Sequence, residues 1–244
     1  MTIVRACTHK DTYTLLLADA REALSDLSPG VSCIITDPAY ASLEKHRSVG
    51  TTTRLTDWFP VLADEEYRSI FRQMYRVLAD NAHCYVLCDH VTMFSFRAFA
   101  EEAGFKFWKP IIWDKRRVGM GYHYRAQYEC ILFLEKGKRK LNNLGVPDFL
   151  RIPELEELSP CGPEILSFPS VRSKGRYPTE KPVDLLRVLV SQSTSPGELV
   201  LDPFMGSGAT GEAALSLSRY FLGIDVSERA YLHTLSRLEA LKAP

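Results

Sequence analysis

Two short loops carry the side chains of this sequence that are best suited to chemistry. The first is Asp37-Pro38-Ala39-Tyr40, which follows an apolar segment at residues 33–36. A carboxylate and the free carbonyl of a proline can accept the two protons of a planar amino group, and an aromatic ring can stack on the base that carries it. Taken alone, the tetrapeptide fits a strand that ends in a proline turn with a core tyrosine better, so its meaning depends on the rest of the chain.

The second loop is rich in glycine and lies between a short apolar segment and a predicted helix: Asp202-Pro203-Phe204-Met205-Gly206-Ser207-Gly208-Ala209-Thr210-Gly211. Glycines at 206 and 208 would let a ligand approach the backbone closely. The next apolar segment ends at Asp225, 17 residues after Gly208. An acidic residue about 20 residues beyond a glycine-rich turn is typical of a ribose-binding site. No Gly-Lys-Ser/Thr follows, so the loop is not a P-loop, and the sequence predicts a nucleoside ligand.

The elements that must position these loops follow from hydrophobic periodicity. Apolar runs predict strands at residues 13–18, 31–36, 84–88, 105–113, 128–134, 199–201 and 220–224. Spacing of three and four residues predicts helices at 20–27, 64–78, 92–103, 183–193, 209–218 and 227–241. This alternation predicts an α/β fold with a largely parallel sheet and helices on both faces. Ligands of such sheets bind at the carboxyl ends of the strands, where both loops are expected to lie.

Length and composition allow one large α/β domain with an appended region, or at most two small domains. The chain has 244 residues, 45% of them hydrophobic, and a net charge of zero. It lacks a long uncharged apolar run, and its first residues do not resemble a signal peptide. Its six cysteines are scattered without a Cys-x-x-Cys pair, which argues against a metal site. We therefore expect a cytoplasmic protein that binds neither a metal nor a membrane.

The charges are unevenly distributed in spite of the zero total. Residues 106–140 hold ten Lys and Arg against three acids, a net charge of +7, whereas residues 148–164 hold five acids against one Arg. A local basic segment fits contact with nucleic-acid phosphates, and a solvated basic face is the plainer alternative. The polar segment 41–60 is expected to be a long loop, and it adds two arginines. The predicted DNA contacts are Arg47, Arg54, Lys115, Arg116, Arg117, Arg125, Lys138, Arg139 and Lys140.

Four motifs in this order resemble a known family, the amino-methylating DNA methyltransferases of the permuted β type. That family has Asp/Ser-Pro-Pro-Tyr/Trp near its N-terminus and Phe-x-Gly-x-Gly near its C-terminus, and this chain matches with residues 37–40 and 204–208. Between them, Trp113-Asp114-Lys115 resembles the segment beside the target base, and Pro178-Thr179-Glu180-Lys181-Pro182 resembles the lead-in to the cofactor region. The resemblance spans nearly the whole chain. It departs at Ala39, where the family has a second proline, and this predicts a less preorganised site.

The resemblance implies a Rossmann-like S-adenosylmethionine-dependent methyltransferase with a circularly permuted motif order. Residues 1–136 would form the catalytic half, 137–176 a small target-recognition insertion, and 177–244 the cofactor-binding half. The implied catalytic residues are Asp37, Pro38 and Tyr40. The implied cofactor-binding residues are Asp19, Ala20, Asp37, Lys181, Phe204, Gly206, Ser207, Gly208, Thr210, Asp225 and Val226. Among these, Lys181 would meet the cofactor carboxylate, Asp225 the ribose hydroxyls and Val226 the adenine.

The expected substrate is double-stranded DNA of a bacterial or phage-encoded system. The target base would be flipped out to stack on Tyr40, and the methyl group would be transferred directly. Asp37 rather than a serine favours N6 of adenine in this family, with N4 of cytosine as the alternative. More distant alternatives are a methyltransferase for RNA or a protein amide, and a catalytically silent DNA- or nucleotide-binding protein. The chain carries no nuclease signature, and many relatives form homodimers.

Overall fold

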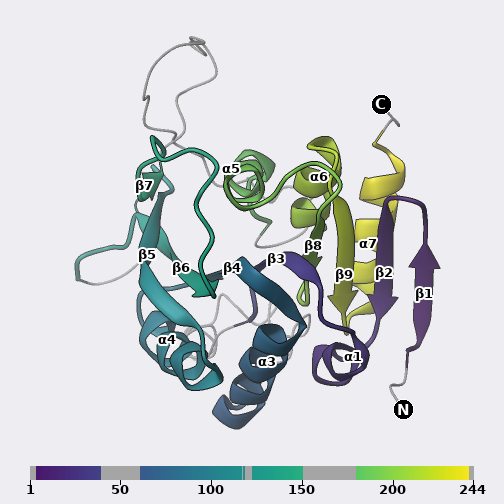
Figure 1. Cartoon of the computed structure of the whole chain (residues 1–244), viewed down its shortest axis with the longest axis horizontal. Helices are drawn as coiled ribbons and strands as arrows, with labels where there is room; N and C mark the ends of the chain where they lie inside the picture. Colours follow the sequence, from purple (N-terminus) through teal and green to yellow (C-terminus); the bar gives the residue numbers. More distant parts are fainter. Residues whose placement is uncertain (1–3, 40–60, 117, 119–122, 151–179, 242–244) are drawn as a thin grey trace.

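The structure is a computed structural model that describes residues 4–39, 61–116, 118, 123–150 and 180–241. These residues form a nine-stranded sheet in the order β1-β2-β9-β8-β3-β4-β6-β5-β7, with helices packed on both sides (Figure 1). The strands are β1 (Ala6–His9), β2 (Tyr13–Leu17), β3 (Val31–Thr36), β4 (Leu78–Cys88), β5 (Lys106–Asp114), β6 (Tyr128–Lys136), β7 (Phe149–Leu150), β8 (Leu199–Asp202) and β9 (Tyr220–Asp225). The helices are α1 (Ala20–Asp26), α3 (Asp64–Val77), α4 (Thr92–Ala103), α5 (Val183–Ser193), α6 (Ala209–Ser216) and α7 (Glu228–Glu239).

The centre of the sheet is parallel, and antiparallel pairs flank it on both sides. Strands β2, β9, β8, β3 and β4 run in one direction. Strand β1 pairs antiparallel with β2, and β6 lies antiparallel between β4 and β5. The prediction of a largely parallel sheet is therefore confirmed for the centre and differs at the sides. Strands β1 and β2 pair antiparallel because residues 10–12, which join them, are too few for a parallel return, which needs a crossover of about a dozen or more residues.

Two hydrophobic cores separate the sheet from its helices. On one face, α1, α3 and α4 contribute buried side chains that include Leu24, Phe71 and Phe96. On the other face, α5, α6 and α7 contribute others, among them Leu189 and Ala213. Apolar residues recur in α3 at the spacing that the sequence predicts, and each of them is buried. The helices thus cover both faces of the sheet, as expected for an α/β fold.

Two strands and part of a third escape prediction from the sequence. Strand β4 begins at Leu78, but its next residues include the exposed Asn81, so the apolar run that marks it starts only at Ala82. Strand β1 alternates between half-buried and exposed residues, and β7 has two residues. These short or polar segments become strands because neighbouring strands offer backbone partners.

The described part of the expected insertion packs on the domain. Strand β7 pairs with β5 at the edge of the sheet. The side-chain amide of Asn142 donates to the carbonyl oxygens of Ser191 and Thr194 at 2.7 and 2.9 Å, which ties this segment to the end of α5. Residues 137–150 therefore join the core fold, and the rest of the expected insertion lies outside the described residues.

Candidate active site

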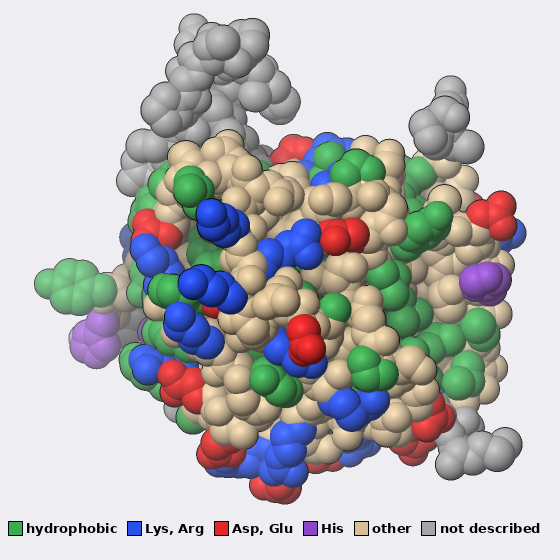
Figure 2. Space-filling model, in the orientation of Figure 1, with side chains coloured by type: hydrophobic (Ala, Val, Ile, Leu, Met, Phe, Trp, Pro, Cys, Tyr) green, Lys and Arg blue, Asp and Glu red, His purple; other side chains and the backbone are tan. Residues whose placement is uncertain are grey.

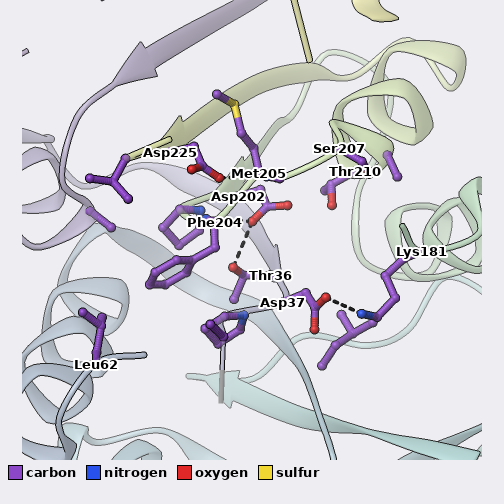
Figure 3. Close-up of a pocket in the computed structure, with 18 of the residues that line it drawn as sticks. Thr36, Asp37, Leu62, Lys181, Asp202, Phe204, Met205, Ser207, Thr210 and Asp225 are labelled. Atoms are coloured by element: carbon purple, nitrogen blue, oxygen red, sulfur yellow. Dashed lines mark hydrogen bonds and ion pairs between the residues drawn. The ribbon is translucent and has the colours of Figure 1, made fainter. Parts of the chain in front are cut away.

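A cavity of about 450 Å³ opens at the carboxyl edge of the parallel strands. It lies where β2, β3, β8 and β9 end, and α1 and α3 close one side of it (Figure 3). Both chemistry-bearing loops reach it, as the sequence predicts. The lining includes Asp19, Ala20, Arg21, Thr36, Asp37, Pro38, Ala39, Leu62, Glu66, Lys181, Asp202, Phe204, Met205, Gly206, Ser207, Thr210, Asp225 and Val226.

A hydrogen bond between the ends of β3 and β8 brings the two loops together. The hydroxyl of Thr36 donates to Oδ1 of Asp202 at 2.9 Å, and the amide of Phe204 donates to the same oxygen at 3.0 Å. Burial raises the pKa of Asp202 to about 7, although these hydrogen bonds oppose the rise. The sequence analysis did not single out Asp202 as a site residue. A signal was present, since Asp202-Pro203 repeats the strand-Asp-Pro pattern of Asp37-Pro38.

Asp37 has one occupied and one free carboxylate oxygen. The ammonium of Lys181 donates to Oδ2 (Figure 3). Oδ1 is buried and has no hydrogen-bond partner in the described part of the chain. Burial raises the pKa of Asp37, and the charge of Lys181 opposes this rise. The free Oδ1 can accept a proton from an amino group that enters the cavity.

Lys181 is shared between two carboxylates. Its Nζ lies 3.7 Å from Oε2 of Glu129 as well as against Asp37. Burial lowers the pKa of Lys181, but the charges of Asp37 and Glu129 outweigh burial and the net direction is upward. The resemblance implied that Lys181 meets a cofactor carboxylate, and the structure shows it paired with carboxylates of the chain itself. Glu129 was missed because it lies within an otherwise apolar strand, where the sequence shows no motif.

The carbonyl of Ala39 is held by the chain itself. The hydroxyl of Tyr67, on α3, donates to this carbonyl oxygen. Ala39 replaces the second proline of the resembled family, and this hydrogen bond restrains the backbone at that residue. The sequence marks Tyr67 only as one of the apolar positions of the helix predicted at 64–78. Tyr40, the predicted stacking residue, lies outside the described residues, as do Arg47 and Arg54.

The acid after β9 sits against the glycine-rich loop. Oδ2 of Asp225 accepts from the amide of Gly206 at 3.0 Å, and Oδ1 accepts from the amide of Ser227 at 2.8 Å. Burial raises the pKa of Asp225, against the effect of these hydrogen bonds. Val226 follows at the mouth and is 37% exposed. These residues together offer acceptors for hydroxyls beside an open apolar surface.

Gly208 allows close packing between two helices. It has a φ of +76°, and a Cβ placed on it would lie 2.8 Å from the Cγ2 and Oγ1 atoms of Thr234. The position therefore allows α6 to begin close against α7. Gly208 does not line the cavity, whereas Gly206, Ser207 and Thr210 do.

Three charged side chains that follow β2 or face its end line the cavity. Asp19 caps α1 by accepting from the amide of Arg21 at 2.8 Å. The guanidinium of Arg21 also binds the carboxylates of Asp19 and of Glu66 on α3. Asp19 and Ala20, which the resemblance implies as cofactor-binding residues, thus lie in the cavity wall.

The predicted DNA contacts divide between the carboxyl edge of the sheet, where the parallel strands end, and the opposite edge, where those strands begin. Lys115, Arg116 and Arg125 lie in the β5–β6 connection, at the same edge as Asp37, because Cys88 at the end of β4 pairs with Cys130 near the start of β6. Lys138, Arg139 and Lys140 follow β6 and lie at the opposite edge, where Arg139 binds Glu198 at 2.9 Å. Arg117 lies outside the described residues. Figure 2 shows Lys and Arg side chains gathered on the side of β5 and β6 with acidic side chains among them.

The donor set of the cavity fits a nucleoside with a charged tail. Asp225 offers a half-buried carboxylate for ribose hydroxyls, and Phe204 and Val226 offer apolar surface for a base. Lys181, which Asp37 and Glu129 already hold, offers an ammonium that a further carboxylate can share. No group of three or more His, Cys, Asp or Glu side chains in the described residues could hold a metal ion. None of the described helices is long and apolar enough to cross a membrane.

Fold, cavity and donor set define a nucleoside-cofactor enzyme of the Rossmann-like methyltransferase class. A family model described as DNA methylase, for N6 and N4 amino groups, matches residues 31–235. The chain therefore belongs to the N6/N4 DNA methylase family. Members of this family methylate amino groups of DNA bases with S-adenosylmethionine as methyl donor.

Two curated relatives and two solved structures resemble the chain over most of its length. The Type II methyltransferase M2.DpnII of Streptococcus pneumoniae is 27% identical over 95% of this chain and 91% of its own. The DNA adenine methyltransferase YhdJ of Escherichia coli is 25% identical over 94% and 83%. The M1.HpyAVI–SAM complex aligns with a TM-score of 0.63 at 25% identity, over 92% of this chain and 99% of that one. The cytosine-N4-specific PvuII DNA methyltransferase aligns with a TM-score of 0.69 at 14% identity over 96% and 89%, which shows the shared fold.

Proposed function

We propose that this protein methylates N6 of adenine in double-stranded DNA. The observation that carries the proposal is the free, buried Oδ1 of Asp37, at the end of β3 and beside the cavity that the cofactor would fill. Relatives of known base include both an adenine and a cytosine-N4 enzyme. The choice of adenine therefore rests on Asp37 itself, since an aspartate at this position favours adenine in the family that the chain resembles.

The residues of the first loop would bind and orient the target base. Oδ1 of Asp37 and the carbonyl of Pro38 would accept the two protons of the amino group, and the ring of Tyr40 would stack on the base. A base inside a duplex is out of reach, so we propose that it is flipped out, at a cost of a few kcal/mol. Holding the amino nitrogen in line with the methyl group supplies much of the rate enhancement. The proton lost by the nitrogen can pass to Oδ1 of Asp37.

The residues of the second loop would hold the cofactor. S-adenosylmethionine supplies an activated methyl group on a sulfonium. Asp225 would accept hydrogen bonds from its ribose hydroxyls, Val226 and Phe204 would contact the adenine, and Lys181 would meet the carboxylate. The remaining proposed contacts come from Asp19, Ala20, Asp37, Gly206, Ser207 and Thr210. Gly208 supports this loop from behind, where it packs on Thr234.

DNA would approach the carboxyl edge of the sheet. Lys115, Arg116, Arg117 and Arg125 would contact its phosphates from the β5–β6 connection, together with Arg47 and Arg54. We leave out Lys138, Arg139 and Lys140, because the opposite edge of the sheet carries them. A homodimer and a bacterial cytoplasm remain part of the proposal, and sedimentation in solution tests the dimer.

A labelled-methyl assay tests the proposal. Genomic DNA from an unmethylated host is incubated with the protein and labelled S-adenosylmethionine, then digested to nucleosides and separated. We expect label in N6-methyladenine and a loss of about 100-fold or more in Asp37→Asn. Asp184→Asn, an exposed aspartate on α5, serves as the matched control. Label in N4-methylcytosine would overturn the choice of base.

A second candidate function is the binding of DNA or a nucleotide without catalysis. Ala39, which replaces a proline of the family motif, motivates it. Calorimetry with S-adenosylmethionine separates it from the enzyme. Cofactor binding without incorporation into any DNA would favour the silent binder.

A further inference from the structure

Four side chains of alternating charge connect the β5–β6 connection to the catalytic loop. Nζ of Lys115 lies 3.0 Å from Oε1 of Glu129, whose Oε2 lies 3.7 Å from Nζ of Lys181. Lys181 in turn donates to Asp37. We call these four residues the charge chain. Its two inner members, Glu129 and Lys181, have side chains that are only 16% and 10% exposed.

Lys181 is held unequally by its two carboxylates. It makes a hydrogen bond to Asp37, whereas its contact with Glu129 is longer and leaves Oε2 without a hydrogen-bond partner in the described residues. The other oxygen of Glu129 is taken by Lys115. Oε2 of Glu129 can therefore accept a hydrogen bond from Lys181. The positive charge of Lys115 partly neutralises the Glu129 carboxylate and so weakens its attraction for Lys181. Such charges interact strongly in surroundings shielded from water.

The same arrangement occupies one of the two carboxylate oxygens of Asp37. With Lys181 on Oδ2, only the buried Oδ1 lacks a hydrogen-bond partner in the described part of the chain and is left to accept from an amino group. Lys115 begins the basic connection that the proposed function places against DNA, so a phosphate competes with Glu129 for its ammonium. Lys115, at the DNA end of the charge chain, is thus linked through Glu129 and Lys181 to Asp37, at the end that meets the base.

We propose, on the basis of the proposed function, that Glu129 is a positioning residue that competes with Asp37 for Lys181. Lys115 controls this competition by neutralising part of the charge of Glu129. When Lys115 turns to a DNA phosphate, Glu129 draws Lys181 toward itself. Oδ2 of Asp37 is then released, and the carboxylate becomes a full acceptor only when DNA is present.

The ionisation of Asp37 reports on the charge chain. Besides Lys181 and Glu129, the groups that face Asp37 are Asp202, at the end of β8, and Cys88, at the end of β4. Burial raises the pKa of the Cys88 thiol, so it stays neutral. Burial raises the pKa of Asp202 to about 7, so its titration must be followed beside that of Asp37.

The first test titrates the side-chain carboxyl carbon of Asp37 by NMR in protein labelled at aspartate, assigned with Asp37→Asn. Glu129→Gln removes a negative charge and leaves Lys181 to Asp37, so the pKa of Asp37 should fall by about half a unit or more. Lys115→Met exposes the full charge of Glu129, so the pKa of Asp37 should rise. A general loosening of the site would not shift the two variants in opposite directions, but direct charge removal would, so the response to DNA in the second test is what separates a movement of Lys181 from a simple change of charge.

Two matched controls isolate the effect. Glu135→Gln changes a buried glutamate on the same strand, β6, that contacts Trp108 and not Lys181. Lys138→Met changes an exposed lysine at the opposite edge. Both should leave the titration of Asp37 in place. Shifts of the same sign in Glu129→Gln and Lys115→Met, or no shift in either, would overturn the proposal.

The second test adds a short DNA duplex of mixed sequence. The pKa of Asp37 should rise with DNA in the wild-type protein and stay constant in Lys115→Met. In methyl transfer at saturating DNA, Glu129→Gln should lose about tenfold in kcat with little change in KM for DNA, and Glu129→Asp should recover most of it. Wild-type protein that shows these NMR shifts but methylates no DNA would refute the proposed function and not the charge chain. Methylation without the shifts would refute the charge chain alone.

Discussion

The hydroxyl of Thr36 donates to Oδ1 of Asp202 at 2.9 Å, although 166 residues separate the two in the chain. This bond joins the strand before the catalytic loop to the strand before the cofactor loop (Figure 3). Both side chains are buried, at 1% and 3% exposure. It therefore sets the relative position of the two halves of the site.

Thr36→Val keeps the shape of this side chain and removes the donor. A buried carboxylate that loses a hydrogen bond costs about 1–3 kcal/mol. We expect this loss in the free energy of unfolding, measured with urea, and a weaker binding of S-adenosylmethionine. Thr36→Ser keeps the hydroxyl and should lose less. Equal stability of the two variants would contradict the role given to this bond.

Asp202 should make stability depend on pH. Burial raises its pKa from 3.8 to about 7. Between these values the folded protein keeps a proton that the unfolded chain has released, so this contribution to stability is full below 3.8 and is lost as the pH rises through 7. Asp202→Asn should remove this component, and urea unfolding on both sides of the window would measure it. An unchanged pH dependence in the variant would mean that Asp202 is ionised when folded.

Tyr67 should compensate for the missing proline at position 39. Tyr67→Phe removes the hydrogen bond to the Ala39 carbonyl. A bond of this kind contributes about 1 kcal/mol, so we expect methyl transfer to slow by about three- to tenfold. Ala39→Pro restricts the same backbone by its ring, so the penalty of Tyr67→Phe should shrink in that background. The four rates form a double-mutant cycle, and additive effects would show that the two restraints are independent.

Gly208→Ala should destabilise the protein by more than backbone strain alone. Gly208 and Gly197 have positive φ angles of +76° and +81°, but a Cβ at Gly208 meets Thr234 at 2.8 Å and one at Gly197 meets nothing within 4 Å. Gly197→Ala should therefore cost only about 1–2 kcal/mol. Gly208→Ala should cost more and weaken cofactor binding, measured by thermal unfolding and calorimetry. Equal losses of stability in Gly208→Ala and Gly197→Ala would mean that α6 can move away from α7 with little loss of free energy.

The two edges of the sheet should differ in their effect on DNA binding. Arg116→Ala and Arg125→Ala should each reduce the slope of log affinity against log salt by about one, as expected for one lost phosphate contact. Lys138→Ala and Lys140→Ala should leave the slope unchanged, since they lie at the opposite edge. Fluorescence anisotropy with a labelled duplex at several salt concentrations measures this. A smaller salt slope in Lys138→Ala or Lys140→Ala would mean that DNA binds at the opposite edge of the sheet.

The catalytic and cofactor loops could be found from the sequence because their chemistry is local. Asp37, Phe204, Gly206 and Asp225 stand in short motifs, and the order of the motifs identified the family that the family model confirms. The helices were predicted well for the same reason, since an amphipathic helix shows its buried face in its own residues.

The long-range partners could not be found in this way. The sequence did not indicate that Lys181 pairs with Asp37 and Glu129, that Tyr67 holds Ala39, or that Gly208 faces Thr234. Strand neighbours and charge pairs depend on residues that are distant in the chain, and no periodicity records them.

The sequence by itself thus determined the class of fold, the two loops and the kind of ligand, because each depends on residues within a few positions of one another. Only the tertiary structure decided which carboxylate oxygen of Asp37 is free, which edge of the sheet carries Lys115 and which carries Lys138. These outcomes depend on strand order and direction, which arise when distant segments pair their backbones and bury their apolar faces together.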